Sequence, residues 1–299
     1  MAKIVITGGT GLVGSYLSKM LSNNSHEVIH LSRTPDSSAE YPTFEWNIKS
    51  GYIDPKAFDG VDHVIHLAGA GVADKKWTSS RKKEIIDSRV ESIKLLKSHI
   101  EKHQVKLKSF ISASAIGYYG MDTGETRLTE DSEPGEDFLA HVVKLWEAEA
   151  DSLTELTKVA KVRIGVVLAK EGGALKEIAK PVKLFVGAPL GSGDQYMSWI
   201  HMYDLCAIFR HILENKLEGT YNATAPNPVT NEALTRSLAK ALKKPLILPN
   251  VPSFVMRSLL GEMALMVLGG NYVLSDKIQS TGFKFKFTQV DAAVKDIHG

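Results

Sequence analysis

The chain has 299 residues, with 36 Lys and Arg against 34 Asp and Glu, so its net charge at pH 7 is only +2. This balance gives no general reason to expect nucleic acid or an anionic membrane as a partner, and the composition is that of an ordinary globular protein. The single cysteine, Cys206, excludes an internal disulfide framework, favours a reducing compartment and is expected to be a buried packing residue.

The N-terminal segment predicts a dinucleotide-binding turn. An apolar strand at residues 3–6 runs into a glycine-rich turn, and an amphipathic helix follows at 15–22. Glycines at these spacings allow a tight turn, a close approach of the backbone to a pyrophosphate, and close packing of the helix. The amides at the helix start point toward the phosphates. The expected contacts are Gly8, Thr10, Gly11, Leu12, Val13 and Gly14.

The second predicted strand, 27–31, is followed by Ser32 and Arg33. A site that prefers NAD usually places Asp or Glu here to bind the ribose 2′-hydroxyl. A guanidinium instead suits a 2′-phosphate, because it can form charge-assisted and bidentate hydrogen bonds. We therefore predict NADP(H) as the cofactor.

Further strands are predicted at 61–67, 109–114 and 162–168, with helices at about 79–103 and 138–157. Short apolar strands that alternate with helices indicate a parallel sheet buried on both faces. The expected fold is α/β, a Rossmann-type doubly wound parallel sheet over residues 1–168.

Beyond residue 168, glycines and prolines break the chain into shorter elements. We expect a smaller C-terminal α+β substrate domain over 169–299, with segments near 199–223 returning to the sheet. The apolar stretch 254–268 is too short and too charged to span a bilayer, and is interpreted as a core or lid helix. The first strand begins at residue 3, which leaves no room for a signal peptide, so the cytoplasm is the expected location.

Several motifs together resemble the extended short-chain dehydrogenases/reductases, and specifically their atypical "epimerase family protein" group. The motifs are Thr7–Gly14, Leu31–Pro35, His66–Gly69, Ser112–Gly120, Asp137–Ala140 with Trp146-Glu147, Arg163–Leu168, Gly191–Gly193 with Trp199–His201, and Gly282–Phe285. The resemblance covers essentially the whole chain. It implies that Leu67, Ala68, Gly69, Ser112 and Ala113 border the cofactor and that Glu84 and Arg89 reach it. For Glu84, an exposed position on the helix surface is an equally open alternative.

The same resemblance implies a catalytic Ser, Tyr and Lys, of which only the serine has a match. Ser114 takes the serine position, whereas the tyrosine and lysine positions fall near Leu139 and Val143, neither of which can donate a proton. Tyr118, Tyr119 and His141 are the candidate substitutes. The alternatives are packing over the nicotinamide or substrate for the tyrosines and an exposed helix position for the histidine. No metal site is expected.

The predicted activity is hydride transfer between NADP(H) and a carbonyl or carbinol of a small molecule such as a nucleotide sugar, in an oxidoreductase or epimerase-like enzyme. The alternative is an NADP(H)-binding sensor without turnover, because the Tyr and Lys are missing. Neither nucleic acid nor membrane is expected as a partner, and the resemblance allows a homodimer paired through the helices at 79–103 and 138–157.

Overall fold

A single eight-stranded sheet forms the centre of the fold, in a computed structural model that describes residues 1–298. Its strand order is β12-β8-β6-β5-β1-β2-β3-β4, and all neighbours are parallel except β3 and β4. The strands are β1 (Lys3–Thr7), β2 (Glu27–Ser32), β3 (Thr43–Asn47), β4 (Tyr52–Ile53), β5 (His63–His66), β6 (Ser109–Ala115), β8 (Lys158–Ile164) and β12 (Gly219–Ala223). This confirms the predicted doubly wound α/β fold.

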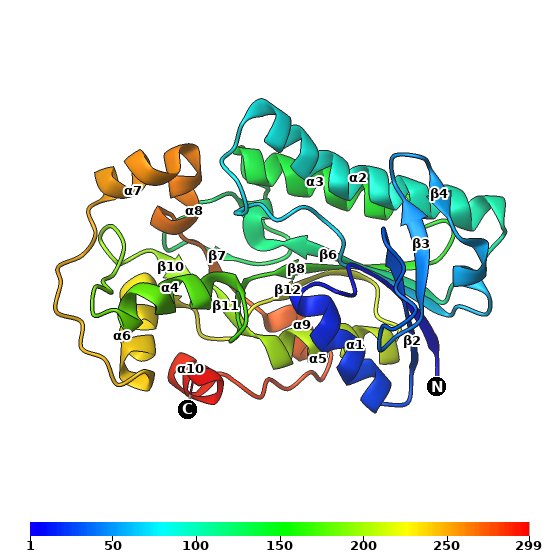
Figure 1. The fold of residues 1–299 in the computed structure, drawn as a ribbon. Helices are drawn as coiled ribbons and strands as arrows, with labels where there is room; N and C mark the ends of the chain where they lie inside the picture. Colours follow the sequence, from blue (N-terminus) through cyan, green and yellow to red (C-terminus); the bar gives the residue numbers. More distant parts are fainter. Residues whose placement is uncertain (299) are drawn as a thin grey trace.

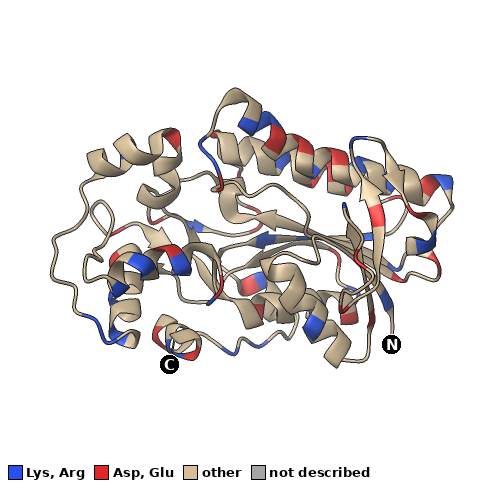
Figure 2. Ribbon diagram, viewed as in Figure 1, with Lys and Arg blue, Asp and Glu red and all other residues tan. Residues whose placement is uncertain are grey.

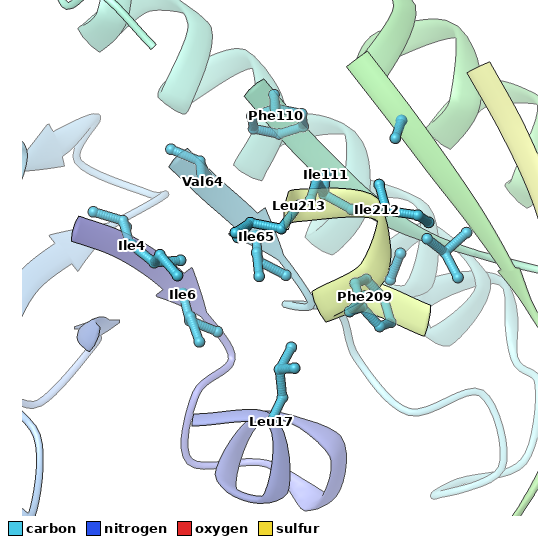
Figure 3. Packing of buried hydrophobic residues seen from close by; sticks show 14 of the residues in the cluster. Ile4, Ile6, Leu17, Val64, Ile65, Phe110, Ile111, Phe209, Ile212 and Leu213 are labelled. Atoms are coloured by element: carbon cyan, nitrogen blue, oxygen red, sulfur yellow. The ribbon is translucent and has the colours of Figure 1, made fainter. Parts of the chain in front are cut away.

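Helices cover both faces of this sheet (Figure 1). The long helices α2 (Ser79–Lys102) and α3 (Phe138–Asp151) lie on one face, and α1 (Leu12–Asn23) and α5 (Met202–Glu214) lie on the other. Because both faces are covered, strands such as β5 and β6 are buried along nearly their whole length. Figure 3 shows Ile4 and Ile6 of β1 packed with Leu17 of α1 and Phe209 of α5.

The chain from residue 166 to residue 298 adds a second, smaller hydrophobic core, in which Leu168, Trp199, Leu238 and Val294 are buried. Its helices are α4 (Gly173–Lys183), α6 (Asn231–Ala241) and α10 (Val290–His298). Three short strand pairs accompany them: β9 (Val166–Leu168) with β11 (Trp199–His201), β10 (Tyr196–Met197) with β13 (Val229–Thr230), and β7 (Arg127–Leu128) with β14 (Tyr272–Val273). The remaining short elements are η1 (Pro55–Phe58), η2 (Ile116–Tyr119), α7 (Ser253–Leu260), η3 (Gly261–Ala264), α8 (Leu265–Leu268) and α9 (Asp276–Ser280).

The segment 199–223 contributes to the main sheet, since β12 pairs with β8 and α5 packs beside α1. The C-terminal segment also reaches the main core through Ile278 and Phe283. The boundary at residue 168 stays a prediction.

Three sequence expectations differ from the structure. The strands β3 and β4 were not predicted. Helix α3 ends at Asp151 rather than 157, and the predicted strand 162–168 is divided between β8, Lys158–Ile164, in the main sheet and β9, Val166–Leu168, which pairs with β11. The segment 254–268 was expected to be a core or lid helix. The core alternative is wrong for α7, which has no buried residue and ends at Gly261, at φ +59°. Glycine adopts a positive φ of this kind without steric cost, which other residues rarely do. The lid alternative stays a prediction.

Cys206 is fully buried in α5, as predicted, and burial raises the pKa of its thiol. No helix within residues 1–298 is long and apolar enough to cross a bilayer.

Candidate functional site

The sheet register brings the predicted cofactor residues to one edge. Thr7 at the end of β1 pairs with Leu31 of β2 on one side and with His66 of β5 on the other, and His66 in turn pairs with Ser112 of β6. The residues that follow each strand are therefore neighbours at the carboxyl edge. Strands β1 and β5 are neighbours in the sheet, but the chain continues from them in opposite directions: from β1 it runs to β2 on one side, and from β5 it runs to β6 on the other. In open α/β sheets, ligands bind at such a switch point.

The turn between β1 and α1 has the backbone shape that a pyrophosphate requires. Gly8 lies at φ +69°, in the left-handed region, and its carbonyl accepts a hydrogen bond from the Gly11 amide at 3.0 Å. A Cβ atom at Gly14 would overlap the Gly8 carbonyl oxygen, so only glycine permits this packing of the helix against the turn. The sequence identified both positions.

The start of α1 faces this turn without a side-chain cap. Gly11 is the N-cap and offers no side chain to accept from the first helical amides. Thr10, Gly11 and Leu12 are exposed, and Val13 is half-buried. Uncapped amides at a helix start form an anion-binding site. The turn therefore suits the phosphates of a dinucleotide.

A buried hydrogen-bond relay fixes the strand ends on both sides of the turn. The Thr7 hydroxyl oxygen accepts from the amides of Leu67 and Ala68, each at 3.2 Å, and lies 2.9 Å from Nδ1 of His66. Nε2 of His66 lies 2.8 Å from the Ser92 hydroxyl, which itself donates to the Arg89 carbonyl. Burial lowers the pKa of His66 to about 3.

The neutral ring of His66 therefore accepts from Thr7 at Nδ1 and donates to Ser92 at Nε2. This role of His66 was not predicted from the sequence, although a histidine inside an apolar strand was a visible signal.

Ser32 and Arg33 lie at the carboxyl end of β2, beside the turn. The Ser32 hydroxyl donates to the Thr34 carbonyl at 2.9 Å, while the Arg33 side chain is exposed. A guanidinium in this place is available to an anionic group on the adenosine ribose.

Arg89 and Glu84 of α2 have different surroundings. Nη1 of Arg89 donates to the carbonyls of Ala70, at 3.0 Å, and Ile85, at 2.9 Å, and a Cβ at Gly69 would lie 3.1 Å from its Cζ. Burial lowers the pKa of Arg89 to about 10. Arg89 thus lies beside the segment after β5, whereas Glu84 is exposed and paired with Arg81 at 2.7 Å.

Ser114 belongs to a buried ionic network. Its hydroxyl donates to Oε1 of Glu147 at 2.6 Å, and Glu147 accepts from Nε and Nη2 of Arg163 at 2.8 and 2.9 Å. Nη1 of Arg163 donates to the Tyr119 hydroxyl at 3.0 Å, which donates to Oδ1 of Asn222 at 2.7 Å. The ion pair raises the pKa of Arg163 against the effect of its burial. This network was not predicted from the sequence, in which its one signal is Arg163, an arginine within an otherwise apolar strand.

The remaining candidate groups lie around η2 and α3. The Tyr118 ring is half-buried, with Cζ of Arg163 only 3.4 Å from its centroid. Leu139 of α3 packs toward Gly117, as does Val143. His141 is exposed and lies two positions from each of them, so its side chain points to the opposite side of α3. Ser112 is buried, and its hydroxyl donates to the Ala113 carbonyl at 2.8 Å.

Within residues 1–298, no group of three or more His, Cys, Asp or Glu side chains is placed so that it could hold a metal ion. His99 and His103 stack with ring centroids 4.4 Å apart, and His63 is 2.7 Å from the Ser109 hydroxyl.

Comparison with known proteins extends these observations. The profile of the NAD dependent epimerase/dehydratase family matches residues 4–224, and that of a domain of unknown function, DUF1731, matches 251–297. The epimerase family protein YfhF of Bacillus subtilis is 33% identical, with 98% of this chain and 97% of YfhF covered.

Among solved structures, the chain is similar to the human epimerase family protein SDR39U1, whose crystal structure was determined with NADPH. The two sequences are 32% identical, 99% of each chain is covered, and the TM-score is 0.89. The UDP-N-acetylglucosamine 4-epimerase from Bacillus cereus shares the fold, with a TM-score of 0.80, 18% identity and coverage of 100% of this chain and 98% of its own.

Proposed function

Because the chain belongs to the NAD dependent epimerase/dehydratase family, we propose that it binds NADP(H) in the turn between β1 and α1. The observation that carries this proposal is the glycine cradle at Gly8 and Gly14 beside the exposed Arg33. The solved human relative with NADPH supports it. The pyrophosphate would lie at the start of α1, and Arg33 would hold the 2′-phosphate.

This proposal is tested by titrating the chain with NADPH and with NADH, following the fluorescence of the reduced nicotinamide. We expect NADPH to bind more tightly than NADH. Arg33→Ala should weaken NADPH binding roughly tenfold, since a hydrogen bond to a charged group contributes about 1.5 kcal/mol or more. NADH binding should not change.

Arg236→Ala is the matched control, because Arg236 is a similarly exposed arginine on α6, paired with Glu232. It should bind both cofactors as the wild type does. A preference for NADPH that survives Arg33→Ala contradicts the assignment of Arg33.

For the reaction, we propose reduction of a carbonyl or oxidation of a carbinol on a small molecule such as a nucleotide sugar. The bound cofactor would supply or accept the hydride. The chain's own contribution would be a proton donor near the end of β6, and Tyr118 fits this role better than Tyr119 or His141. Tyr118 is half-buried and contacts the buried network through the face of its ring, whereas the Tyr119 hydroxyl is held by Arg163 and Asn222. His141 points to the other side of α3. The cytoplasmic location stays a prediction.

A second candidate function, an NADP(H) sensor without turnover, is favoured by a specific observation. The Ser114 hydroxyl donates to Glu147, and Leu139 and Val143 occupy the positions where the resemblance places Tyr and Lys. Assays of NADPH oxidation against aldehydes, ketones and nucleotide sugars distinguish the two functions. Turnover supports the enzyme. No turnover, together with hydrogen exchange that differs between the NADPH and NADP⁺ complexes, supports the sensor.

A further inference from the structure

Large apolar side chains project from one edge of the smaller core. Leu184, Phe185 and Val186 follow α4 and are 72%, 49% and 52% exposed, and Ile247 and Leu248 follow α6 with 71% and 48%. A monomeric protein normally exposes such residues singly, and a group of them marks an interaction site.

The two segments that carry them run side by side. Nζ of Lys244 lies 4.1 Å from the centre of the Phe185 ring at one end. At the other end, Val251 exchanges backbone hydrogen bonds at 2.8 Å with Pro189 and Gly191. Helix α7 begins directly after this contact, and its Phe254 and Leu259 are 74% and 60% exposed. We call these seven side chains the apolar edge: Leu184, Phe185, Val186, Ile247, Leu248, Phe254 and Leu259.

The backbone segments that form the apolar edge carry only positive charge. Residues 178–193 and 233–261 contain seven Lys and Arg and no Asp or Glu, although the whole chain is nearly neutral. Figure 2 shows this basic character at the ends of α4 and α6. Among residues 1–298, no carboxylate lies within 4 Å of Lys183, Lys243, Lys244 or Arg257.

The other three basic residues of the two segments, Lys180, Arg236 and Lys240, pair with acidic residues that lie outside these segments. Glu177 binds Lys180 at 2.7 Å, Glu232 binds Arg236 at 2.6 Å, and Asp291 lies 3.9 Å from Lys240. Four cations of these two segments, Lys183, Lys243, Lys244 and Arg257, are therefore left without a carboxylate partner among residues 1–298, and Lys244 contacts the apolar edge directly.

We propose that the apolar edge binds the surface of an anionic lipid bilayer, with its apolar side chains in the interface and its lysines at the headgroups. Proteins that lie on a membrane combine exposed apolar side chains with basic residues in this way. The net charge of +2 had argued against a membrane partner, but it conceals this local excess of basic residues.

The observations favour a bilayer over other occupants. A second copy of the chain joined through the same edge would bring the two sets of lysines together, and like charges at an interface are unfavourable. The apolar side chains also come from two separate segments of the chain, and Leu184, Ile247 and Phe254 are each more than two-thirds exposed. They project from the surface as groups that insert into an interface do.

The test measures co-sedimentation of the full chain with vesicles of phosphatidylcholine alone or with phosphatidylglycerol added. We expect binding to the anionic vesicles only, and weaker binding as salt increases. The double variant Lys243→Gln/Lys244→Gln should reduce partitioning roughly tenfold or more, because each basic residue near an anionic surface contributes about a fivefold factor. Leu184→Ser/Ile247→Ser should reduce it roughly tenfold as well, through the lost apolar burial.

Matched controls come from the far end of the molecule. Lys102→Gln/Lys106→Gln removes two exposed lysines, and Leu156→Ser removes an exposed leucine, so partitioning should stay as in the wild type. An Ile247→Trp variant adds a direct readout, since its emission should shift to the blue on anionic vesicles. Circular dichroism establishes that each variant is folded.

Three outcomes would overturn the proposal: no binding to anionic vesicles at low salt, binding that the apolar variants leave unchanged, or light scattering that shows a dimer lost in Leu184→Ser/Ile247→Ser.

Discussion

Two adjacent tyrosines, Tyr118 and Tyr119, have the same chemistry and opposite surroundings. Tyr119 is buried, and burial raises the pKa of its hydroxyl to about 12 while Asn222 and Arg163 hold it in place. Tyr118 is half-buried and packs its ring on Arg163. The sequence placed both tyrosines after the fourth predicted strand but could not separate them, because their partners come from β8 and β12, more than 40 residues later in the chain.

We expect Tyr118→Phe and Tyr119→Phe to affect different properties. If Tyr118 is the proton donor, Tyr118→Phe should lower kcat about a hundredfold or more, and should change the free energy of unfolding by less than about 0.5 kcal/mol. Tyr119→Phe should destabilise the fold by about 1–2 kcal/mol, because Asn222 loses its donor and Arg163 an acceptor. Urea unfolding and steady-state assays measure the two effects. Equal kcat in wild type and Tyr118→Phe would remove Tyr118 from the reaction.

At the scale of elements, one carboxylate holds the C-terminal segment against α5. Asp204, in the first turn of α5, is 1% exposed, and its two oxygens accept from the amides of Lys286 and Phe287 at 2.9 Å each. Asp204→Ala leaves two amides without a partner, so we expect a loss of about 2–4 kcal/mol and faster proteolysis within 284–298. Asp291→Ala, at an exposed position of α10, is the control and should resemble the wild type. Unchanged cleavage in Asp204→Ala would show that other contacts hold the segment.

Elements whose sequence signal lies within a few consecutive residues were predicted, whereas elements that depend on distant packing partners were not. The strand, turn and helix at the N-terminus were predictable, because the apolar strand and the glycine spacing lie within a dozen residues. Strand β3 was missed because Trp46 is its only buried residue, so its pattern is not that of a central strand. For α7 the apolar pattern suggested a core or lid helix, but the helix packs only partly, against η3, and none of its residues is fully buried. A hydrophobic pattern states what a helix could bury and not whether a partner exists.

At the scale of the whole molecule, buried histidines make stability depend on pH. Burial lowers the pKa of His63 and His201 to about 4 and that of His66 to about 3, and these residues belong to β5 and β11. In the unfolded chain a histidine titrates near 6.5. Between these values the unfolded state binds more protons than the folded state, so stability is highest above about pH 6.5 and falls as the pH decreases toward 4.

We expect the urea midpoint to be nearly constant from pH 8 to 7 and to fall steadily from pH 6.5 to 5. Each buried histidine should contribute a loss of about 1 kcal/mol per pH unit. His63→Asn should reduce this slope, because an amide can still pair with the Ser109 hydroxyl but does not titrate. His141→Asn removes an exposed histidine and should leave the slope as in the wild type. If His63→Asn and the wild type lose stability equally between pH 6.5 and 5, His63 is not neutral in the folded protein and other groups carry the acid sensitivity.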